Sequence, residues 1–209
     1  MQTILLTSSG KFLTDGDLSF LPKPITQMKI AYITTASKGV SDISYLERHR
    51  KRMKELNYNF KEIDIEGKNE QELEDILKNK EIIHVEGGNT FYLLKVVLES
   101  GFDKVIKELV RNGIIYIGSS AGSYIACPTI EMATWKHQDK YNHYGITDFT
   151  ALNLVPFLVT AHYKPEYQEL LKEKIKTSKY PVRILTDEQA ILVQDEEVKL
   201  VGNGKEIKL

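Results

Sequence analysis

Short runs of aliphatic and β-branched residues alternate with helical patterns through the first two-thirds of the 209-residue sequence. An amphipathic helix repeats its apolar residues every three or four positions, whereas a strand buried on both faces is a short continuous apolar run. Runs of the second kind predict five strands: Thr3–Thr7, Lys29–Thr34, Asn59–Ile65, Ile82–Glu86 and Ile114–Ile117. Strands separated by helices in this way predict an α/β fold, in which helices cover both faces of a mostly parallel sheet.

Capping residues indicate where several of the intervening helices begin or end. Asn69 and Glu72 form the pattern of a capping box, and residues 89–90 can start another helix. A helix over Phe102–Asn112 would be closed by Gly113, because glycine readily adopts the left-handed conformation that follows many helices.

The last third of the chain has a different pattern. Residues 134–150 are polar and aromatic and predict a long loop. From Val182 onward, tight turns at 194–196 and 202–204 separate short strands, which predicts antiparallel strands at the edge of the parallel sheet. The length suits one domain and no linker interrupts the chain, so residues 1–209 are expected to form a single domain.

The composition is that of a soluble globular protein, with 42% hydrophobic and 27% charged residues. A net charge of −1 gives no broad electrostatic attraction to nucleic acids or anionic membranes. Cys127 is the one cysteine, which excludes an intramolecular disulfide and a CxxC metal site and favours a small core residue. The N-terminus lacks the pattern of a signal peptide, and no apolar run is long enough to span a bilayer, so we expect a cytoplasmic protein.

The stretch Gly118-Ser119-Ser120-Ala121-Gly122 follows a predicted strand and matches the pattern G-x-S-x-G. In that pattern a sharp strand-to-helix turn exposes the middle serine above the sheet, and the flanking glycines let the backbones pass closely. The spacing favours Ser120 as a nucleophile and leaves Ser119 as the filler. An ordinary strand-to-helix turn, which also favours Gly and Ser, is the alternative.

A serine hydroxyl needs a base to remove its proton, and His162 is the best candidate. It follows the apolar stretch 152–161, where a buried strand would end close to Ser120. The alternative is a strand-end histidine that only bonds to backbone. The other histidines fit this role less well. We expect His49 to be solvated on a charged helix face and His84 to be a core residue, and His137, His143 and Asp139 fit no compact metal-ligand pattern.

The turn at 87–90, Gly-Gly-Asn-Thr, follows one predicted strand and opens a helix. Backbone N–H groups at such a helix start can bind a developing oxyanion. The N–H of Ala121, directly after the candidate nucleophile, would be the second donor. A tight strand-to-helix connection with an asparagine cap is the alternative interpretation.

Residues 87–94, 118–130 and 152–157, together with His162, resemble the peptidase E family of serine peptidases. The resemblance implies a three-layer αβα fold similar to class I glutamine amidotransferases and a Ser-His-Glu triad. It also implies that Ser120 is the nucleophile, that His162 is the base and that the backbone of Gly88 and Ala121 forms the oxyanion hole.

The family's acid lies in a turn between two late strands, which corresponds here to residues 183–193. Glu188 is the predicted acid, and its neighbour Asp187 is the second choice. The resulting order, serine, histidine, acid, differs from the α/β-hydrolase order, in which the acid precedes the histidine. A lipase or esterase of that kind would have to use an acid between nucleophile and base, such as Glu131, Asp139 or Asp148.

Two departures from the family pattern concern specificity. Aspartyl dipeptidases of the family carry an aspartate near the position of Trp135 and an arginine-containing segment after the histidine, whereas residues 162–175 contain no arginine. We therefore expect no strict preference for an N-terminal aspartate. The predicted function is hydrolysis of small peptides through an acyl-enzyme on Ser120, without cofactor or metal and without a nucleic-acid or membrane partner. An esterase or acyltransferase using the same serine, and a non-catalytic binding protein of the same fold, are the alternatives.

Overall fold

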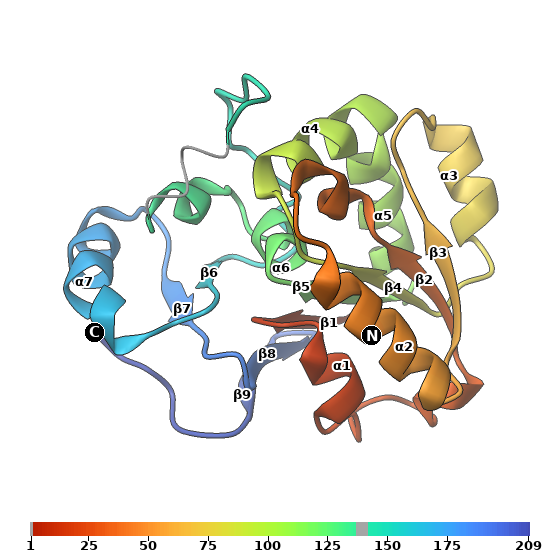
Figure 1. Cartoon of the computed structure of the whole chain (residues 1–209), viewed down its shortest axis with the longest axis horizontal. Helices are drawn as coiled ribbons and strands as arrows, with labels where there is room; N and C mark the ends of the chain where they lie inside the picture. Colours follow the sequence, from red (N-terminus) through yellow and green to blue (C-terminus); the bar gives the residue numbers. More distant parts are fainter. Residues whose placement is uncertain (1, 137–141) are drawn as a thin grey trace.

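The computed structural model describes residues 2–136 and 142–209, and a seven-stranded sheet forms its centre (Figure 1). The strands of this sheet are β1 (Thr3–Thr7), β2 (Lys29–Ile33), β3 (Asn59–Ile63), β4 (Ile82–Val85), β5 (Ile115–Ser119), β8 (Gln189–Gln194) and β9 (Glu197–Gly202). Their order is β3-β2-β4-β5-β1-β8-β9. The first five are mutually parallel, and β8 and β9 add the expected antiparallel edge.

All five strands predicted from the alternating pattern are present, with ends within two residues of the expected positions. They are joined by helices α1 (Lys11–Asp15), α2 (Ser44–Glu55), α3 (Glu70–Leu77), α4 (Thr90–Ser100), α5 (Phe102–Arg111) and α6 (Ala121–Ala126), and α7 (Gln168–Thr177) follows later. Shorter 3-10 turns are η1 (Ile25–Gln27), η2 (Thr35–Gly39), η3 (Glu131–Thr134) and η5 (Pro165–Tyr167).

The predicted caps are also present. Asn69 and Glu72 form a reciprocal capping box at the start of α3, and the side chain of Asn89 accepts the N–H of Tyr92 at the start of α4. Gly113 follows α5 with a φ of 94°. Each of these contacts satisfies backbone groups that a helix end leaves without an intrahelical partner.

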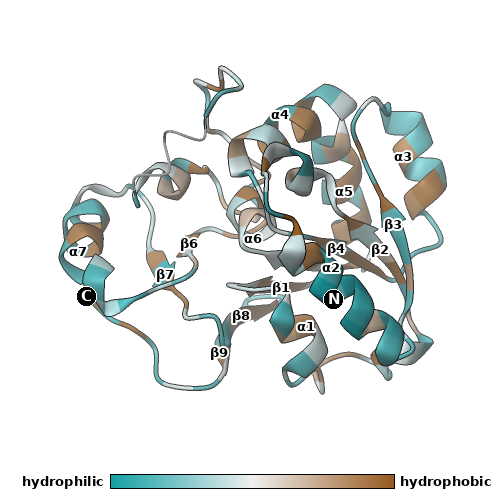
Figure 2. Ribbon diagram, in the orientation of Figure 1, coloured by the Kyte–Doolittle hydropathy of each residue, from teal (hydrophilic) through white to brown (hydrophobic). Residues whose placement is uncertain are grey.

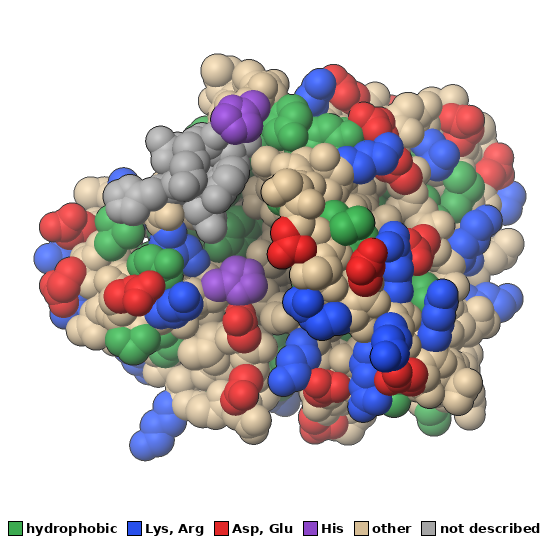
Figure 3. All heavy atoms as spheres, in the orientation of Figure 1, with side chains coloured by type: hydrophobic (Ala, Val, Ile, Leu, Met, Phe, Trp, Pro, Cys, Tyr) green, Lys and Arg blue, Asp and Glu red, His purple; other side chains and the backbone are tan. Residues whose placement is uncertain are grey.

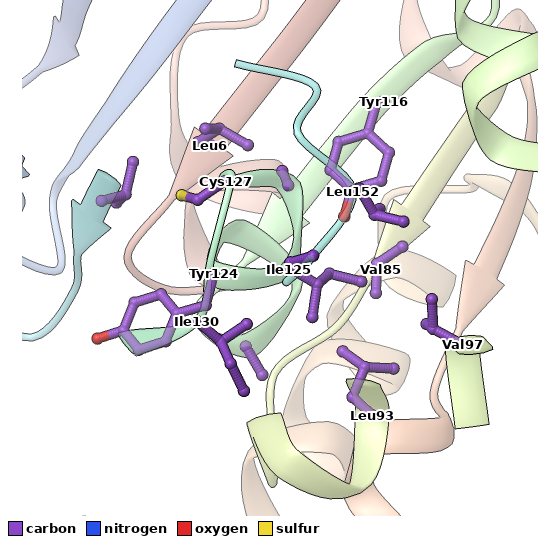
Figure 4. Packing of buried hydrophobic residues seen from close by; sticks show 14 of the residues in the cluster. Leu6, Val85, Leu93, Val97, Tyr116, Tyr124, Ile125, Cys127, Ile130 and Leu152 are labelled. Atoms are coloured by element: carbon purple, nitrogen blue, oxygen red, sulfur yellow. The ribbon is translucent and has the colours of Figure 1, made fainter. Parts of the chain in front are cut away.

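The strands β1, β2, β4, β5 and β8 are buried almost throughout, as strands with helices on either side of the sheet require, whereas the edge strands β3 and β9 are largely exposed. Along β1, Ile4 and Leu6 pack with α3 to α6, whereas Leu5 between them packs with α1 and α2. Figure 2 shows apolar residues concentrated along the central strands, and Figure 4 shows the packing of the α4–α6 side. Cys127 lies in this packing with no exposed surface, and burial raises the pKa of its thiol to about 12, which agrees with the expected core role.

The segment predicted as a long buried strand, residues 152–161, is a strand only at β6 (Leu158–Thr160). Before it, the N–H groups of Leu152, Asn153 and Leu154 donate to carbonyls at the end of α6 and just after it. These bonds wrap the segment around the helix end instead of extending it in a sheet.

β6 pairs in parallel with β7 (Val182–Ile184) in a separate two-stranded sheet. The prediction that every strand after Val182 joins the main sheet is therefore wrong for β7. The prediction of a hairpin at 202–204 is also wrong, because residues 205–209 form no strand. Instead, the N–H of Asn203 donates to the Glu188 carbonyl, and the Gln189 side chain donates to the Lys205 carbonyl.

Among residues 2–136 and 142–209, no helix has both the length and the apolar character needed to cross a bilayer.

Gly122, in the first turn of α6, lies directly against β4. A Cβ at this position would lie 2.0 Å from the Val85 carbonyl oxygen, while the Gly122 carbonyl accepts the Tyr116 hydroxyl at 2.6 Å. The close approach of α6 to β4 therefore requires a residue without a side chain at position 122, and this approach positions the turn that precedes α6.

We predict that Gly122→Ala lowers the free energy of unfolding by about 2–3 kcal/mol, as overpacking in a core does. Elsewhere in a helix the same change usually stabilises a protein. Gly67→Ala is the control, because Gly67 has a φ of 71° but no atom within 4 Å of an added Cβ, so only a cost of about 1 kcal/mol for the left-handed backbone is expected. Urea denaturation measures both, and equal losses would contradict the packing argument.

Candidate active site

Ser120 lies at the turn between β5 and α6, with a φ of 49° and a ψ of −106°. Such a conformation is sparsely populated by residues other than glycine and persists only where its surroundings hold it. Here the Ser120 N–H donates to the Thr7 carbonyl at 3.0 Å, and the Ser120 carbonyl accepts the N–H of Tyr124 in α6 at 2.9 Å. The strained strand-to-helix turn expected from G-x-S-x-G is thus present.

His162 lies beside this serine, as predicted. Its Nε2 is 3.0 Å from the Ser120 Oγ, and its Nδ1 is 2.6 Å from Oδ1 of Asp187. Because a carboxylate can only accept, Nδ1 carries the proton in this pair, and in that tautomer of the neutral ring Nε2 is the nitrogen that can accept the serine proton. The three side chains therefore form a continuous hydrogen-bonded line.

The carboxylate bonded to the histidine is that of Asp187, the second choice, and the structure does not bring the predicted acid Glu188 to the ring. Glu188 makes no hydrogen bond or ion pair with His162, and its backbone carbonyl is bonded to Asn203 at the start of the hairpin strands. Adjacent side chains in this turn leave the backbone in different directions, and only one of them reaches the ring. The hydrogen bond from His162 lowers the pKa of Asp187 to about 2, against the opposing effect of partial burial.

Ser8 is a residue of this cluster that sequence reasoning missed. It follows β1, and its Oγ donates to Asp187 Oδ1 at 2.7 Å and accepts the backbone N–H of His162 at 2.8 Å. It thereby holds the acid and the main chain of His162, whose φ is 57°. The one available signal was a Ser-Ser-Gly turn after the first strand, at the same sheet edge as Ser120.

Lys136 was also missed. Its ammonium group is buried, contacts the Ala161 carbonyl directly before His162, and lies 5.6 Å from the Tyr167 ring centroid. Burial lowers the pKa of Lys136 to about 8, although the charge of Asp187 opposes this shift.

The two expected oxyanion donors lie at the start of helices on either side of Ser120. Gly88, with a φ of 145°, has no room for a side chain, because a Cβ would lie 2.3 Å from the Ala36 carbonyl oxygen. Ala121 is the first residue of α6. Within the described residues neither N–H donates to a protein acceptor, whereas the neighbouring Gly87 N–H is bonded to the Glu86 carboxylate at 2.8 Å.

A second polar network lies beneath the turn. Ser119, the expected filler, is buried and accepts the Thr7 hydroxyl at 3.0 Å, and it lies 2.8 Å from Nε2 of His84. His84 is the core residue that we predicted, and burial lowers its pKa to about 4. Its Nδ1 has no hydrogen-bond partner among the described residues.

His49 is not solvated as predicted. Its Nδ1 lies 2.9 Å from the carboxylate of Glu86, which is 1% exposed and also accepts the Tyr32 hydroxyl at 2.6 Å. Burial acts to raise the pKa of Glu86, but the hydrogen bond from His49, the nearby imidazole rings and the Tyr32 hydroxyl prevail and lower it to about 2. The sequence indicated that His49 lies on a helix, but it did not indicate that the acidic partner would be Glu86, directly after β4.

Two hollows meet at Ser120. The α2 hollow, of about 580 Å³, is lined chiefly by residues from α1, α2 and the segment after β1. The α4 hollow, of about 480 Å³, is lined by the start of α4, residues 39–42 and part of α6. Gly88, Ser120 and His162 line both, so a molecule extending from one hollow to the other passes over the nucleophile. Of the polar-loop residues, His143 lines the α4 hollow, and His137 and Asp139 lie outside the described residues.

We predict that the Glu86 carboxylate stabilises the fold in a pH-dependent way. The pKa of Glu86 is lowered to about 2 in the folded protein, compared with about 4.3 for an unfolded glutamate. The contribution of Glu86 to the free energy of unfolding is therefore complete above about pH 4.3 and is lost as the pH falls toward 2. The stability difference between wild type and Glu86→Gln should therefore be largest near neutral pH and shrink in acid, as measured by thermal unfolding from pH 7 to pH 2.5. Glu47→Gln, on the exposed face of α2, is the control, and a difference that did not vary with pH would contradict the assignment.

Comparison with known proteins agrees with this geometry. Residues 4–201 match the family model described as peptidase family S51. The chain is 34% identical over 209 residues to an uncharacterized peptidase from Pasteurella multocida, an alignment that covers 98% of this chain and 100% of the relative. It is 31% identical over 189 residues to peptidase E from Nostoc, covering 84% of this chain and 73% of that protein.

The fold also matches that of a solved structure. A crystal structure of a candidate peptidase E protein from Listeria monocytogenes has a TM-score of 0.81 to this chain at 28% identity, covering 98% of this chain and 100% of that one. The family model spans nearly the whole sequence and the αβα layers agree, so the resemblance to peptidase E is confirmed and the chain belongs to peptidase family S51.

Proposed function

We propose that the protein is a serine peptidase that hydrolyses short peptides through an acyl-enzyme on Ser120, with a Ser-His-Asp triad in place of the expected Ser-His-Glu. The observation that carries the proposal is the hydrogen-bonded line from Ser120 Oγ through His162 to Asp187, at a strained turn. The backbone N–H groups of Gly88 and Ala121 lie beside it and donate to no acceptor among the described residues.

In the first step His162 Nε2 takes the proton of Ser120 while Oγ bonds to the carbonyl carbon of the substrate. The carbonyl oxygen becomes negatively charged and is bound by the N–H groups of Gly88 and Ala121. Each such donor typically contributes about 10²–10³ in rate. Asp187 holds the ring with its Nδ1–H toward the carboxylate and stabilises the charged imidazolium.

In the second step the C–N bond breaks, and His162 returns the proton to the leaving amine. A water molecule then loses its proton to His162 and attacks the ester carbon. The acid product leaves, and Ser120 regains its proton. No step requires a metal or cofactor. The hollows on either side of Ser120 have the volumes of small-ligand sites and suit short peptides better than folded proteins.

A fluorophosphonate probe and a panel of peptide and ester substrates test the proposal. We expect Ser120 to be labelled, the labelling to be absent in Ser120→Ala, and short peptides to be hydrolysed. Hydrolysis of esters alone would favour the esterase or acyltransferase alternative, and the absence of any labelling would favour a binding protein. The cytoplasmic location stays a prediction, as does the absence of a nucleic-acid partner.

The acid can be tested by two adjacent substitutions. We predict that Asp187→Asn lowers kcat by roughly 10⁴-fold with little change in the folded structure, because an amide favours the wrong tautomer and does not stabilise imidazolium. Glu188→Gln is the matched control and should stay close to wild type. Steady-state kinetics with a hydrolysed dipeptide, together with circular dichroism, measure both, and a larger loss in Glu188→Gln would reverse the assignment.

We also predict that the enzyme does not strictly prefer an N-terminal aspartate. Selecting a carboxylate requires a fixed cation, and the planar fork of arginine serves best. The segment after His162 offers only lysines. The preference for Asp-Leu over Ala-Leu, Ser-Leu and Lys-Leu in kcat/KM should stay below about a hundredfold, or about 2.7 kcal/mol. A greater preference would show that another cation takes the role of the missing arginine.

A further inference from the structure

The two hollows that meet at Ser120 differ in charge. The α2 hollow is lined by Lys11, Arg48 and Arg52 and by the paired His49, against the carboxylates of Asp15 and Glu86. The α4 hollow has Asp42 in its wall and, among the described residues, no lysine or arginine. Figure 3 shows Lys and Arg side chains gathered over α1 and α2 on the face that it presents.

We infer that the α2 hollow binds a carboxylate of the peptide substrate and that Arg48 is the residue that selects it. The inference rests on the proposed peptidase function. It adds a substrate class, namely short peptides that present a carboxylate on the α2 side of the scissile bond.

The pairing of charges in the α2 hollow singles out Arg48. The carboxylate of Glu86 is paired with His49, whose Nδ1 lies 2.9 Å from it. Lys11 lies 3.9 Å and Arg52 3.6 Å from Asp15, so one carboxylate lies between two cations. Arg52 also lies 3.4 Å from Glu55. The two cations Lys11 and Arg52 are therefore matched by the two carboxylates Asp15 and Glu55.

Arg48 forms no ion pair within 4.0 Å among the described residues. Asp42 is the carboxylate whose charge it affects: the Ser44 N–H at 2.8 Å and, to a lesser degree, the charge of Arg48 lower the pKa of Asp42. The guanidinium of Arg48 donates to the Ser44 hydroxyl at 3.1 Å, one helical turn earlier in α2. That bond directs the side chain along the helix while leaving other guanidinium donors available, and a carboxylate can accept two of them side by side.

Charge then sets the direction in which a short peptide lies across Ser120. A carboxylate is attracted to the α2 hollow, and an N-terminal ammonium is repelled from it and can lie toward Asp42 in the α4 hollow. The carboxylate can be the C-terminus of a dipeptide or tripeptide, or an acidic side chain, and both offer the same chemistry to Arg48.

Binding to the inactive Ser120→Ala protein tests this inference without requiring turnover. Calorimetry would compare Ala-Leu, Ala-Leu amide, which lacks the terminal carboxylate, and Ala-Asp amide, which carries a side-chain carboxylate alone. We expect Ala-Leu to bind at least about tenfold more tightly than its amide, since a charge-assisted bond contributes about 1.5–3 kcal/mol and 1.4 kcal/mol is tenfold. Ala-Asp amide would bind like Ala-Leu if a side-chain carboxylate serves equally well, and like Ala-Leu amide if the C-terminus is required.

In the Ser120→Ala protein, adding Arg48→Gln should reduce the ratio of the affinities for Ala-Leu and its amide to about twofold or less. Adding Arg48→Lys should retain part of that preference. Lys51→Gln is the matched control, because it removes one charge from the same helix at a position that does not line the hollow. Equal binding of Ala-Leu, Ala-Leu amide and Ala-Asp amide, or a preference for the carboxylate-bearing peptides that Arg48→Gln does not change, would overturn the inference.

Hydrolysis by the wild-type protein separates this inference from the proposed function. If the Ser120→Ala protein binds Ala-Leu more tightly than its amide but the wild-type protein hydrolyses no peptide, the peptidase proposal is refuted and the carboxylate site is supported. Equal kcat/KM on Ala-Leu and its amide, with the same values in Arg48→Gln, would refute the carboxylate site and leave the peptidase.

Discussion

The candidate active site depends on hydrogen bonds to the carboxyl end of β1. The Thr7 carbonyl accepts the N–H of Ser120 and the hydroxyl of Ser123, which holds the strained turn in place. One residue later, Ser8 binds both the acid and the backbone of His162. Ser120, His162 and Asp187 come from distant parts of the chain, and the last residue of one central strand and the residue that follows it bring them together. A local change there would therefore affect all three at once.

Burial controls the electrostatics around this cluster. Glu86 places a negative charge next to the turn that is proposed to bind an oxyanion, which by itself would oppose the reaction. The protein offsets the charge with His49 and the Tyr32 hydroxyl, and the Gly87 N–H takes one of the carboxylate oxygens. The Gly88 N–H is left without a protein acceptor among the described residues, so it is available to a substrate.

Local sequence patterns were sufficient to predict much of the fold and the turn that carries Ser120. The five parallel strands, the caps at Asn69 and Asn89 and the turn at Ser120 all depend on residues within a few positions of one another, where steric and hydrogen-bonding rules act directly. Prediction was less successful where partners are far apart. Residues 152–154 lie against the end of α6 instead of forming a strand, because their N–H groups donate to carbonyls there that no local pattern reveals.

The sequence by itself determined the α/β class and the turn that places Ser120 at the edge of the sheet, because period and turn chemistry are properties of the chain. The resemblance to the family predicted His162 as the partner of that serine, because the order of motifs is also a property of the chain. Only the tertiary structure decided that Asp187 rather than Glu188 reaches the ring, that Ser8 holds both, and that His49 is paired with Glu86. These outcomes depend on the direction in which side chains leave elements brought together by the sheet. In a turn, a difference of one residue along the chain changes that direction, and neither composition nor spacing predicts which of two neighbouring side chains reaches a distant partner.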